Sequence, residues 1–353
     1  MSKSTKEFGV FLPIAKGGWI ISKTTPLLDA SYRQNREAAI LADEIGMDFI
    51  MSMAKWRGFG GDTGHWGTSL ESVTMMAGIA EVTHRAKIIA TMHAGLHNPA
   101  VTAKMIATLD QISNGRAGLN IVSGSFKDEF IQMGEWDASM SHDQRYAMTE
   151  EWTRMVKRLW SEESVSEKGE FFTLDDCTLL PKPVSSPRPF LVCAGQSERG
   201  LRFSVRHTDV CFIGGKDEAQ TREISLRAKR LASECGTTIK TFCMSTIVCA
   251  PTDQEAEELA AQYRAGLDVE AVRGMMRSFG IEADGQSNAM VERAGNAFMT
   301  HTAIGSPETC RRQLSELLRD AELDGAMLIF PDYVRGLEVF GEQILPRLRA
   351  EFS

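Results

Sequence analysis

The sequence predicts an α/β protein in which eight parallel strands close into a (β/α)8 barrel. Short apolar runs alternate with longer stretches of helical periodicity, a pattern typical of repeated βα units and a parallel sheet. Eight such runs occur, which is the number that closes a barrel of this type. A chain of 353 residues has room for two ordinary domains or one large barrel, and no clean linker divides it. We therefore predict a single domain, 1–353, with insertions.

The expected strands are the apolar runs themselves. In a barrel of this class the chemistry is carried by residues that follow the strands at their carboxyl ends, so these segments hold the candidate site. The runs cover residues 8–12, 48–52, 86–91, 117–122, 190–194, 209–212, 242–249 and 325–329.

Two of the intervening helices carry clear start signals. Asn98 supplies an N-cap, and the proline that follows it is suited to the first position of a helix. Apolar residues then recur at helical spacing. Ser141 and Gln144 form a capping box that begins a second helix. Arg145 and Tyr146 are therefore expected near the start of that helix.

Two stretches interrupt the alternation and are predicted to be insertions. Residues 162–189 contain a cluster of prolines, which excludes a helix there. Residues 280–301 are polar and rich in Gly and Asn, and they follow a helix expected to begin near Asp268. We interpret this second stretch as a segment over one end of the barrel.

Composition and charge narrow the class of partner. Apolar residues make up 43% of the chain, which excludes wholesale disorder. The formal net charge is −8, which argues against nucleic acid or a polybasic contact with a membrane, because both need clustered Lys and Arg. The N-terminus is polar and no window of 18 apolar residues occurs, so we expect a cytoplasmic, non-membrane protein whose partner is a small molecule.

The sequence gives no sign of a metal site or of a disulfide framework. The seven cysteines are an odd number and none has C-x-x-C spacing. His93 and His97 have an i, i+4 spacing but lie on an expected loop without a neighbouring glutamate, so zinc is disfavoured. We expect these two histidines to face a pocket and contact substrate, and we expect no metal.

Three short segments after expected strands could bind a ligand, although each has an ordinary explanation. Residues 55–61 combine two cations with three glycines and could hold an anion, or could be a flexible surface loop. Asn120 places an amide on an apolar strand, where it could meet a heterocycle or neighbouring backbone. Residues 195–197 end a strand and open a helix at a serine, which suits either phosphate or a plain N-cap.

Taken together, these residues resemble the bacterial-luciferase-like flavin monooxygenases, and within that family the pyrimidine monooxygenases of the RutA type. The resemblance extends over nearly the whole chain, and riboflavin lyase and dimethylsulfone monooxygenase are related members. The matching stretches are 8–11 with 13–14 and 18–19, 52–53 with Lys55, 57–61, 70–72 with 76–78, Asn120, 132–134, 145–146 and 193–197.

The resemblance implies a luciferase-like TIM barrel that binds FMN at its C-terminal mouth and uses the reduced cofactor with O2 as co-substrate. It implies catalytic roles for Thr91 and Asn120, which match positions lining an oxygen pocket beside the flavin ring. Ser197, with Arg145 and Tyr146, would hold the FMN phosphate. The positions expected to bind the cofactor are Ala54, Lys55, Asn120, Glu129, Arg145, Tyr146, Gly195, Gln196 and Ser197.

The same resemblance implies a two-component system. The sequence has no second nucleotide fingerprint, so reduced FMN is expected from a separate NAD(P)H-dependent flavin reductase. By analogy with other barrels of this type, we expect a homo-oligomer, either a dimer or a tetramer.

Departures from the family pattern bear on the substrate. The related enzymes look as if they carry a tryptophan at the position where this chain has Ser125. The segment that contains His93 and His97 also departs from the family pattern. Together with Trp19 these residues are the substrate-binding candidates. They favour oxidation or cleavage of a nitrogen heterocycle bulkier than uracil, with a flavin such as riboflavin as one example. The alternatives are a sulfone, sulfonate or organosulfur monooxygenase of the same fold, and a non-catalytic flavin-binding barrel.

Overall fold

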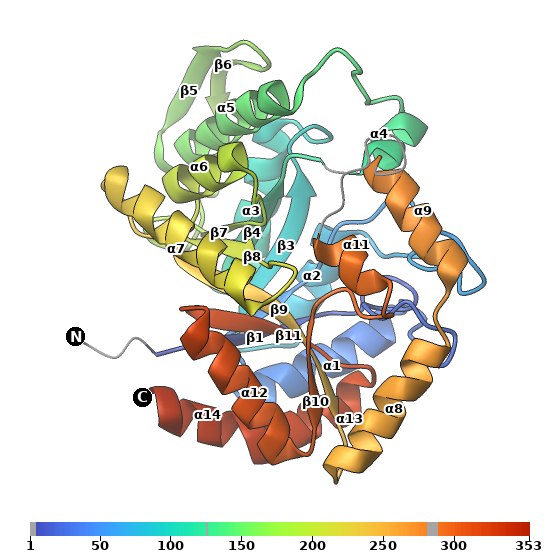
Figure 1. The fold of residues 1–353 in the computed structure, drawn as a ribbon. Coiled ribbons are helices and arrows are strands. Elements are labelled where there is room, and N and C mark those ends of the chain that lie inside the picture. Colours follow the sequence, from blue (N-terminus) through green and yellow to red (C-terminus); the bar gives the residue numbers. More distant parts are fainter. Residues whose placement is uncertain (1–4, 125, 281–288) are drawn as a thin grey trace.

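The computed structural model describes residues 5–124, 126–280 and 289–353, and it shows a closed parallel barrel (Figure 1). The barrel strands follow one another in the order β11-β1-β2-β3-β4-β7-β8-β9, and β9 pairs again with β11 to close the ring. The predicted fold is confirmed, and no strand end differs from its prediction by more than two residues. The strands are β1 (Glu7–Phe11), β2 (Phe49–Met51), β3 (Lys87–His93), β4 (Ala117–Val122), β7 (Phe190–Cys193), β8 (Val210–Ile213), β9 (Lys240–Cys249) and β11 (Gly325–Ile329).

Helices surround the barrel, as the alternating pattern predicts (Figure 1). Both start signals are confirmed: the Asn98 side chain accepts a hydrogen bond from the Ala100 amide, and Ser141 and Gln144 form the reciprocal capping box. The outer helices are α1 (Tyr32–Glu44), α2 (Ser72–Glu81), α3 (Pro99–Ile112), α5 (His142–Ser161), α6 (Glu198–His207), α7 (Glu218–Glu234), α8 (Asp253–Ala265), α12 (Pro307–Asp320), α13 (Tyr333–Val339) and α14 (Leu345–Phe352), with a π-helical segment at Phe340–Ile344.

The stretch 162–189 has no helix, as expected, but it forms an antiparallel hairpin that the sequence did not predict. Its strands are β5 (Ser164–Lys168) and β6 (Thr173–Thr178). The buried carboxylate of Glu151 on α5 accepts hydrogen bonds from the backbone amides of residues 170–172 at 2.7 to 3.0 Å. This carboxylate fixes the hairpin turn against the barrel.

Of the stretch 280–301, residues 281–288 lie outside the described residues. The rest contains α11 (Ala289–Ala294), and it leads into β10 (His301–Gly305), a ninth strand that pairs with β9 outside the barrel ring. Helix α11 packs on α9 (Val269–Phe279), which begins at the predicted Asp268 cap and also contacts α4 (Lys127–Met133). These three helices lie on one side of the barrel (Figure 1).

The lower part of the barrel interior is filled by aromatic side chains. Phe49, Phe212 and Phe242 pack with ring centroids 5.4 to 6.2 Å apart. Gly9 lies against them, since a Cβ there would be 2.3 Å from the Phe49 ring. Because this floor is solid, open space in the barrel remains only toward the carboxyl ends of the strands. Among the described helices none is long and apolar enough to cross a membrane.

Candidate active site

A cavity of about 530 Å3 occupies the carboxyl end of the barrel, and every barrel strand or the loop after it contributes to its wall. That volume is within the range of ordinary small-molecule sites, roughly 300–1,000 Å3. Most of the wall is apolar, as expected for a site that binds a flat ring system. Its larger apolar residues include Phe11, Trp19, Met51, Met53, Trp66, Phe126, Phe212, Met244, Phe279, Met290, Met299 and Met327.

Thr91 and Asn120 meet in this cavity because β3 and β4 place them side by side in register. The Asn120 amide Nδ2 donates to Thr91 Oγ1 at 3.0 Å, and Thr91 Oγ1 donates to the Ser52 carbonyl at 2.5 Å. The Thr91 backbone amide donates to Ser72 Oγ at 2.8 Å, so the threonine is held from both ends. Asn120 Oδ1 is buried and finds no partner among the described residues. A buried amide oxygen without a partner is a ready acceptor for a ligand N–H.

Lys55 and Glu129 form a buried ion pair beside that pair of residues. Lys55 Nζ lies 2.5 Å from Glu129 Oε1, and both side chains are 0% exposed. The ammonium group also lies over the Phe126 ring, 3.6 Å from its centroid, and 4.6 Å from the centroid of Phe59. Burial lowers the pKa of Lys55, and the charge of Glu129 opposes that shift. The ion pair therefore offsets part of the cost of burying an ammonium group in this wall.

His93 also lines the cavity and lies 4.0 Å from Glu129, between Nε2 and Oε2. Burial, then the charges of His97 and Lys55, lowers the pKa of His93 to about 3. The imidazole is therefore neutral near pH 7, and its approach to Glu129 is not an ion pair. Its Nδ1 has no partner among the described residues, which leaves one ring nitrogen available to a ligand.

A second polar cluster lies at the start of α6. Ser197 caps this helix, and its Oγ accepts from the Gly200 amide at 3.0 Å. Burial raises the pKa of Tyr146 to about 12, an effect that its hydrogen bonds to Ser123 and Ser197 oppose, so the hydroxyl remains a donor. Gly195 and Gly200 make room for it, because a Cβ at these positions would lie 2.4 and 2.7 Å from the Tyr146 oxygen. A helix N-terminus with a nearby hydroxyl is suited to an anion such as phosphate.

Arg145 and Gln196 come directly before Tyr146 and Ser197 in the chain. Arg145 Nη1 donates to the Met140 carbonyl at 2.8 Å, and its guanidinium lies 5.1 Å from the centre of the Trp136 ring. Gln196 lines the main cavity, and its Oε1 accepts from the Gly214 amide at 3.1 Å. Ala194 and Gln196 thus line the cavity, whereas Gly195 and Ser197, which alternate with them in the chain, belong to the cluster.

The structure thus brings most of the predicted site residues together. Ala54, Lys55, Thr91, His93, Asn120, Gln196 and Trp19 line the cavity, and Glu129 lies directly behind Lys55. His97 is not part of the cavity wall: its Nδ1 lies 3.0 Å from the His93 carbonyl, and its own carbonyl accepts from Trp152 Nε1 at 2.7 Å. These contacts hold it in the loop after β3. Ser125 lies outside the described residues.

Sequence reasoning missed several polar residues of the cavity, above all Arg293 on α11. Gln220 on α7 and Thr300, just before β10, also belong to its wall. The stretch 280–301 was identified as a segment over the barrel end, but a lone arginine in a polar segment carries no periodicity or motif. Only the fold shows that it faces the cavity.

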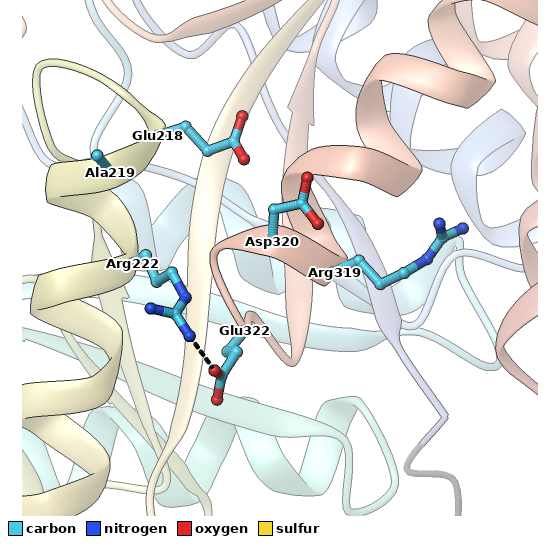
Figure 2. Close-up of a pocket in the computed structure, with 6 residues that line it drawn as sticks. All are labelled: Glu218, Ala219, Arg222, Arg319, Asp320 and Glu322. Atoms are coloured by element: carbon cyan, nitrogen blue, oxygen red, sulfur yellow. Dashed lines mark hydrogen bonds and ion pairs between the residues drawn. The ribbon is translucent and has the colours of Figure 1, made fainter.

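A second recess lies on the outer wall of the barrel, between the start of α7 and the end of α12 (Figure 2). Its lining is charged. Arg222 and Glu322 form an ion pair there at 2.9 Å, and their side chains are 52% and 44% exposed. It lies away from the strand ends and contains no buried polar group without a partner. Within the described residues no cluster of three or more His, Cys, Asp or Glu side chains could hold a metal ion. The cavity in the barrel mouth is therefore the candidate site.

Comparisons with known proteins identify the family of the chain. The sequence model of a family described as luciferase-like monooxygenase matches residues 6–325. Pyrimidine monooxygenase RutA of Acinetobacter baylyi is 35% identical over 348 residues, covering 96% of this chain and 94% of the relative. The protein of the same name from Caulobacter segnis is 37% identical over 354 residues, covering 98% and 99%.

Solved structures share the fold at lower identity. Riboflavin lyase (RcaE), solved with modified FMN and riboflavin, has a TM-score of 0.86 and 20% identity, with 98% of this chain and 92% of that chain covered. The long-chain alkane monooxygenase LadA has a TM-score of 0.85 and 18% identity, with 99% and 92% covered.

Proposed function

This chain belongs to the luciferase-like monooxygenase family and is a flavin-dependent monooxygenase, and from that premise we propose that it uses reduced FMN and O2 to oxidise or cleave a nitrogen heterocycle bulkier than uracil. The observation that carries the proposal is the Asn120–Thr91 pair, which presents an unpartnered amide oxygen in a largely apolar cavity.

The cavity fits the ring system of FMN. Asn120 Oδ1 can accept from a ring N–H, and the apolar wall can cover the flat faces of the isoalloxazine. Lys55, paired with Glu129, can offset the negative charge of the reduced ring. Ala54 next to it has a small side chain that lets a ring approach the backbone.

The cluster at the start of α6 fits the phosphate. Ser197 and the free amides of the first helical turn face outward, and Tyr146 contributes a hydroxyl that stays protonated. Gly195 provides the space for that hydroxyl, and Arg145, the residue before Tyr146 in the chain, is the cation that we propose for the phosphate. The phosphate would lie here with the ring extending into the barrel mouth past Gln196.

The bound reduced FMN would supply the two electrons that let one oxygen atom enter the substrate while the other leaves as water. The protein's part is to hold, orient and shield. Thr91, held by Ser52 and Ser72, fixes Asn120 against the reacting ring. The apolar wall limits entry of water that would discharge the reduced cofactor without product.

The class of substrate is supported by relatives and by sequence. Relatives that are 35% and 37% identical in sequence are named for pyrimidines, whereas the riboflavin lyase structure holds a flavin substrate. Related enzymes look as if they carry a tryptophan at position 125, and the smaller serine of this chain favours a ring larger than uracil. Ser125→Trp is expected to abolish turnover of a bulky substrate and to spare a small one; equal turnover of both rings by the variant would remove this part of the proposal.

We propose that a separate NAD(P)H-dependent reductase supplies the reduced FMN. Chemically reduced FMN should then support product formation without any reductase present. A requirement for direct contact with one particular reductase would contradict a freely diffusing cofactor.

The function is tested by anaerobic mixing with reduced FMN, followed by heavy-isotope oxygen, across pyrimidines, flavins and sulfones. We expect one heavy oxygen atom in the product of a heterocycle. Heavy oxygen only in sulfur products would favour the sulfone alternative, and oxygen uptake no greater than that of free reduced FMN would favour a non-catalytic barrel. The Asn120→Ala variant is the matched control, because it removes the proposed contact and leaves the outer surface unchanged.

A further inference from the structure

Arg293 is an arginine of the cavity wall that forms no ion pair with a described carboxylate, and the charges of Asp217 and Glu292 act on it only from beyond ion-pair distance. It lies on α11 and reaches the cavity from the side of β8 and β10. Its Nη2 donates to the Gly215 carbonyl and lies 2.9 and 3.2 Å from the two ring nitrogens of His301. Because its partners lie in the loop after β8 and at the start of β10, the guanidinium has a fixed position between two segments.

The partners of Arg293 are neutral. Burial, followed by the charge of Arg293 itself, lowers the pKa of His301 to about 3, so the imidazole carries no charge near pH 7. Thr221 Oγ1 lies 2.9 Å from His301 Nε2 and donates its own proton to the Asp217 carbonyl. A neutral imidazole can accept a hydrogen bond from Arg293 through a ring nitrogen, and Arg293 Nη2 lies nearer to Nε2, at 2.9 Å, than to Nδ1, at 3.2 Å. This network orients the arginine without neutralising it.

The charges of the cavity are unbalanced at this point. Lys55 and Arg293 are the two cations in its described wall, and the wall has no carboxylate of its own. The Lys55 charge is met by Glu129 behind it, whereas no described Asp or Glu lies within ion-pair distance of Arg293. Its Nε and Nη1 atoms have no hydrogen-bond acceptor among the described residues, so donors remain available to a ligand.

We propose that Arg293 is the specificity-determining residue of the cavity and that it binds a carboxylate carried by the substrate ring. This inference rests on the proposed function, since it names the class of heterocycle that the same cavity accepts. A planar guanidinium with free donors suits a carboxylate, which it can bind through two hydrogen bonds, better than a neutral carbonyl. The flavin phosphate has its own expected site at Ser197 and Tyr146, on α6 and α5.

The experiment compares ring carboxylates with their neutral amides, which have nearly the same shape. The probes are uracil-5-carboxylate and uracil-6-carboxylate with the matching carboxamides, titrated by calorimetry into the FMN-loaded protein. Wild type is expected to bind at least one carboxylate about tenfold or more tightly than its amide. Arg293→Gln should abolish that preference and leave amide binding unchanged, and Arg293→Lys should retain part of it.

Arg264→Gln is the matched control, because Arg264 lines the outer groove next to Arg293 and not the cavity. It should leave both affinities unchanged. The inference is overturned if wild type shows no preference for either carboxylate, if Arg293→Gln weakens carboxylate and amide equally, or if its main effect is loss of FMN affinity in an anaerobic titration.

Failure of this inference can be told apart from failure of the proposed function. Calorimetry reports carboxylate recognition whether or not the ring is oxidised, and incorporation of heavy oxygen into a neutral heterocycle reports oxygenation without Arg293. A preference that depends on Arg293, without oxygenation of any ring, would support the subsite and refute the proposed reaction. Oxygenation of neutral rings without any preference for a carboxylate would support the proposed reaction and refute the subsite at Arg293.

Discussion

The buried Lys55–Glu129 pair gives the sharpest prediction about stability. Glu129→Gln keeps the shape of the side chain but removes the charge 2.5 Å from Lys55 Nζ, at a position where both side chains are 0% exposed. Lys55 must then stay charged and unpaired or give up its proton. Neutralising a lysine of ordinary pKa at pH 7 costs about 4–5 kcal/mol, which sets an upper limit to the loss. Breaking a buried pair typically costs about 3–5 kcal/mol. We therefore expect about 3–4 kcal/mol of destabilisation.

The dependence on pH has a definite sign. Burial lowers the pKa of folded Lys55 below its ordinary value of 10.5, and Glu129 opposes that shift. Without Glu129 the pKa of Lys55 in the folded protein is lower still. Below pH 10.5, Lys55 therefore binds more protons in the unfolded chain than in the folded one. Stability then rises with pH in this window, and the loss caused by Glu129→Gln should be smaller at pH 9.5 than at pH 7.

Urea unfolding of the flavin-free protein, followed by the fluorescence of its six tryptophans, measures these changes. The double variant Lys55→Met/Glu129→Gln should be more stable than the two single losses predict when added, because it leaves no unpaired charge. As a control, Glu270→Gln breaks an exposed pair with Arg273 and should change stability by less than about 1 kcal/mol. A loss below about 1 kcal/mol for Glu129→Gln, or simple additivity in the double variant, would refute the reasoning.

Three further predictions concern the cofactor and the reaction. Asn120→Ala should lower the single-turnover rate of oxygenation about 100- to 1,000-fold, and an unchanged rate would remove Asn120 from the reaction. Gly195→Ala should weaken FMN binding about tenfold or more, because its Cβ would lie 2.4 Å from the Tyr146 oxygen; Tyr146→Phe in the same chain should recover part of the affinity, and no recovery would show that the clash lies elsewhere. Ser197→Ala should cost about 1 kcal/mol of stability through loss of the helix cap and should weaken FMN more than riboflavin in fluorescence titrations, whereas equal weakening of both would place the phosphate elsewhere.

The sequence by itself determined the barrel and much of its mouth. The strands were predictable because they are mainly apolar and largely buried on both faces. The helix starts were predictable because Asn98 and Ser141 cap their helices through local hydrogen bonds. Thr91 and Asn120 could be assigned to the site because parallel strands bring their carboxyl ends to one rim, and the two residues prove to be partners in register.

The tertiary structure alone decided what surrounds those residues. Strand β10 was not predicted because its sequence is not an apolar run, and it is stabilised by pairing with β9. The contact between Lys55 and Glu129 joins the loop after β2 to α4, and nothing local in either segment encodes it. Arg293 reaches the cavity only because α11 is positioned by α9 and by the turn into β10. Local sequence patterns determine where helices and strands form. The positions of buried charges, and the ligands that these charges select, depend on contacts between segments far apart in the chain.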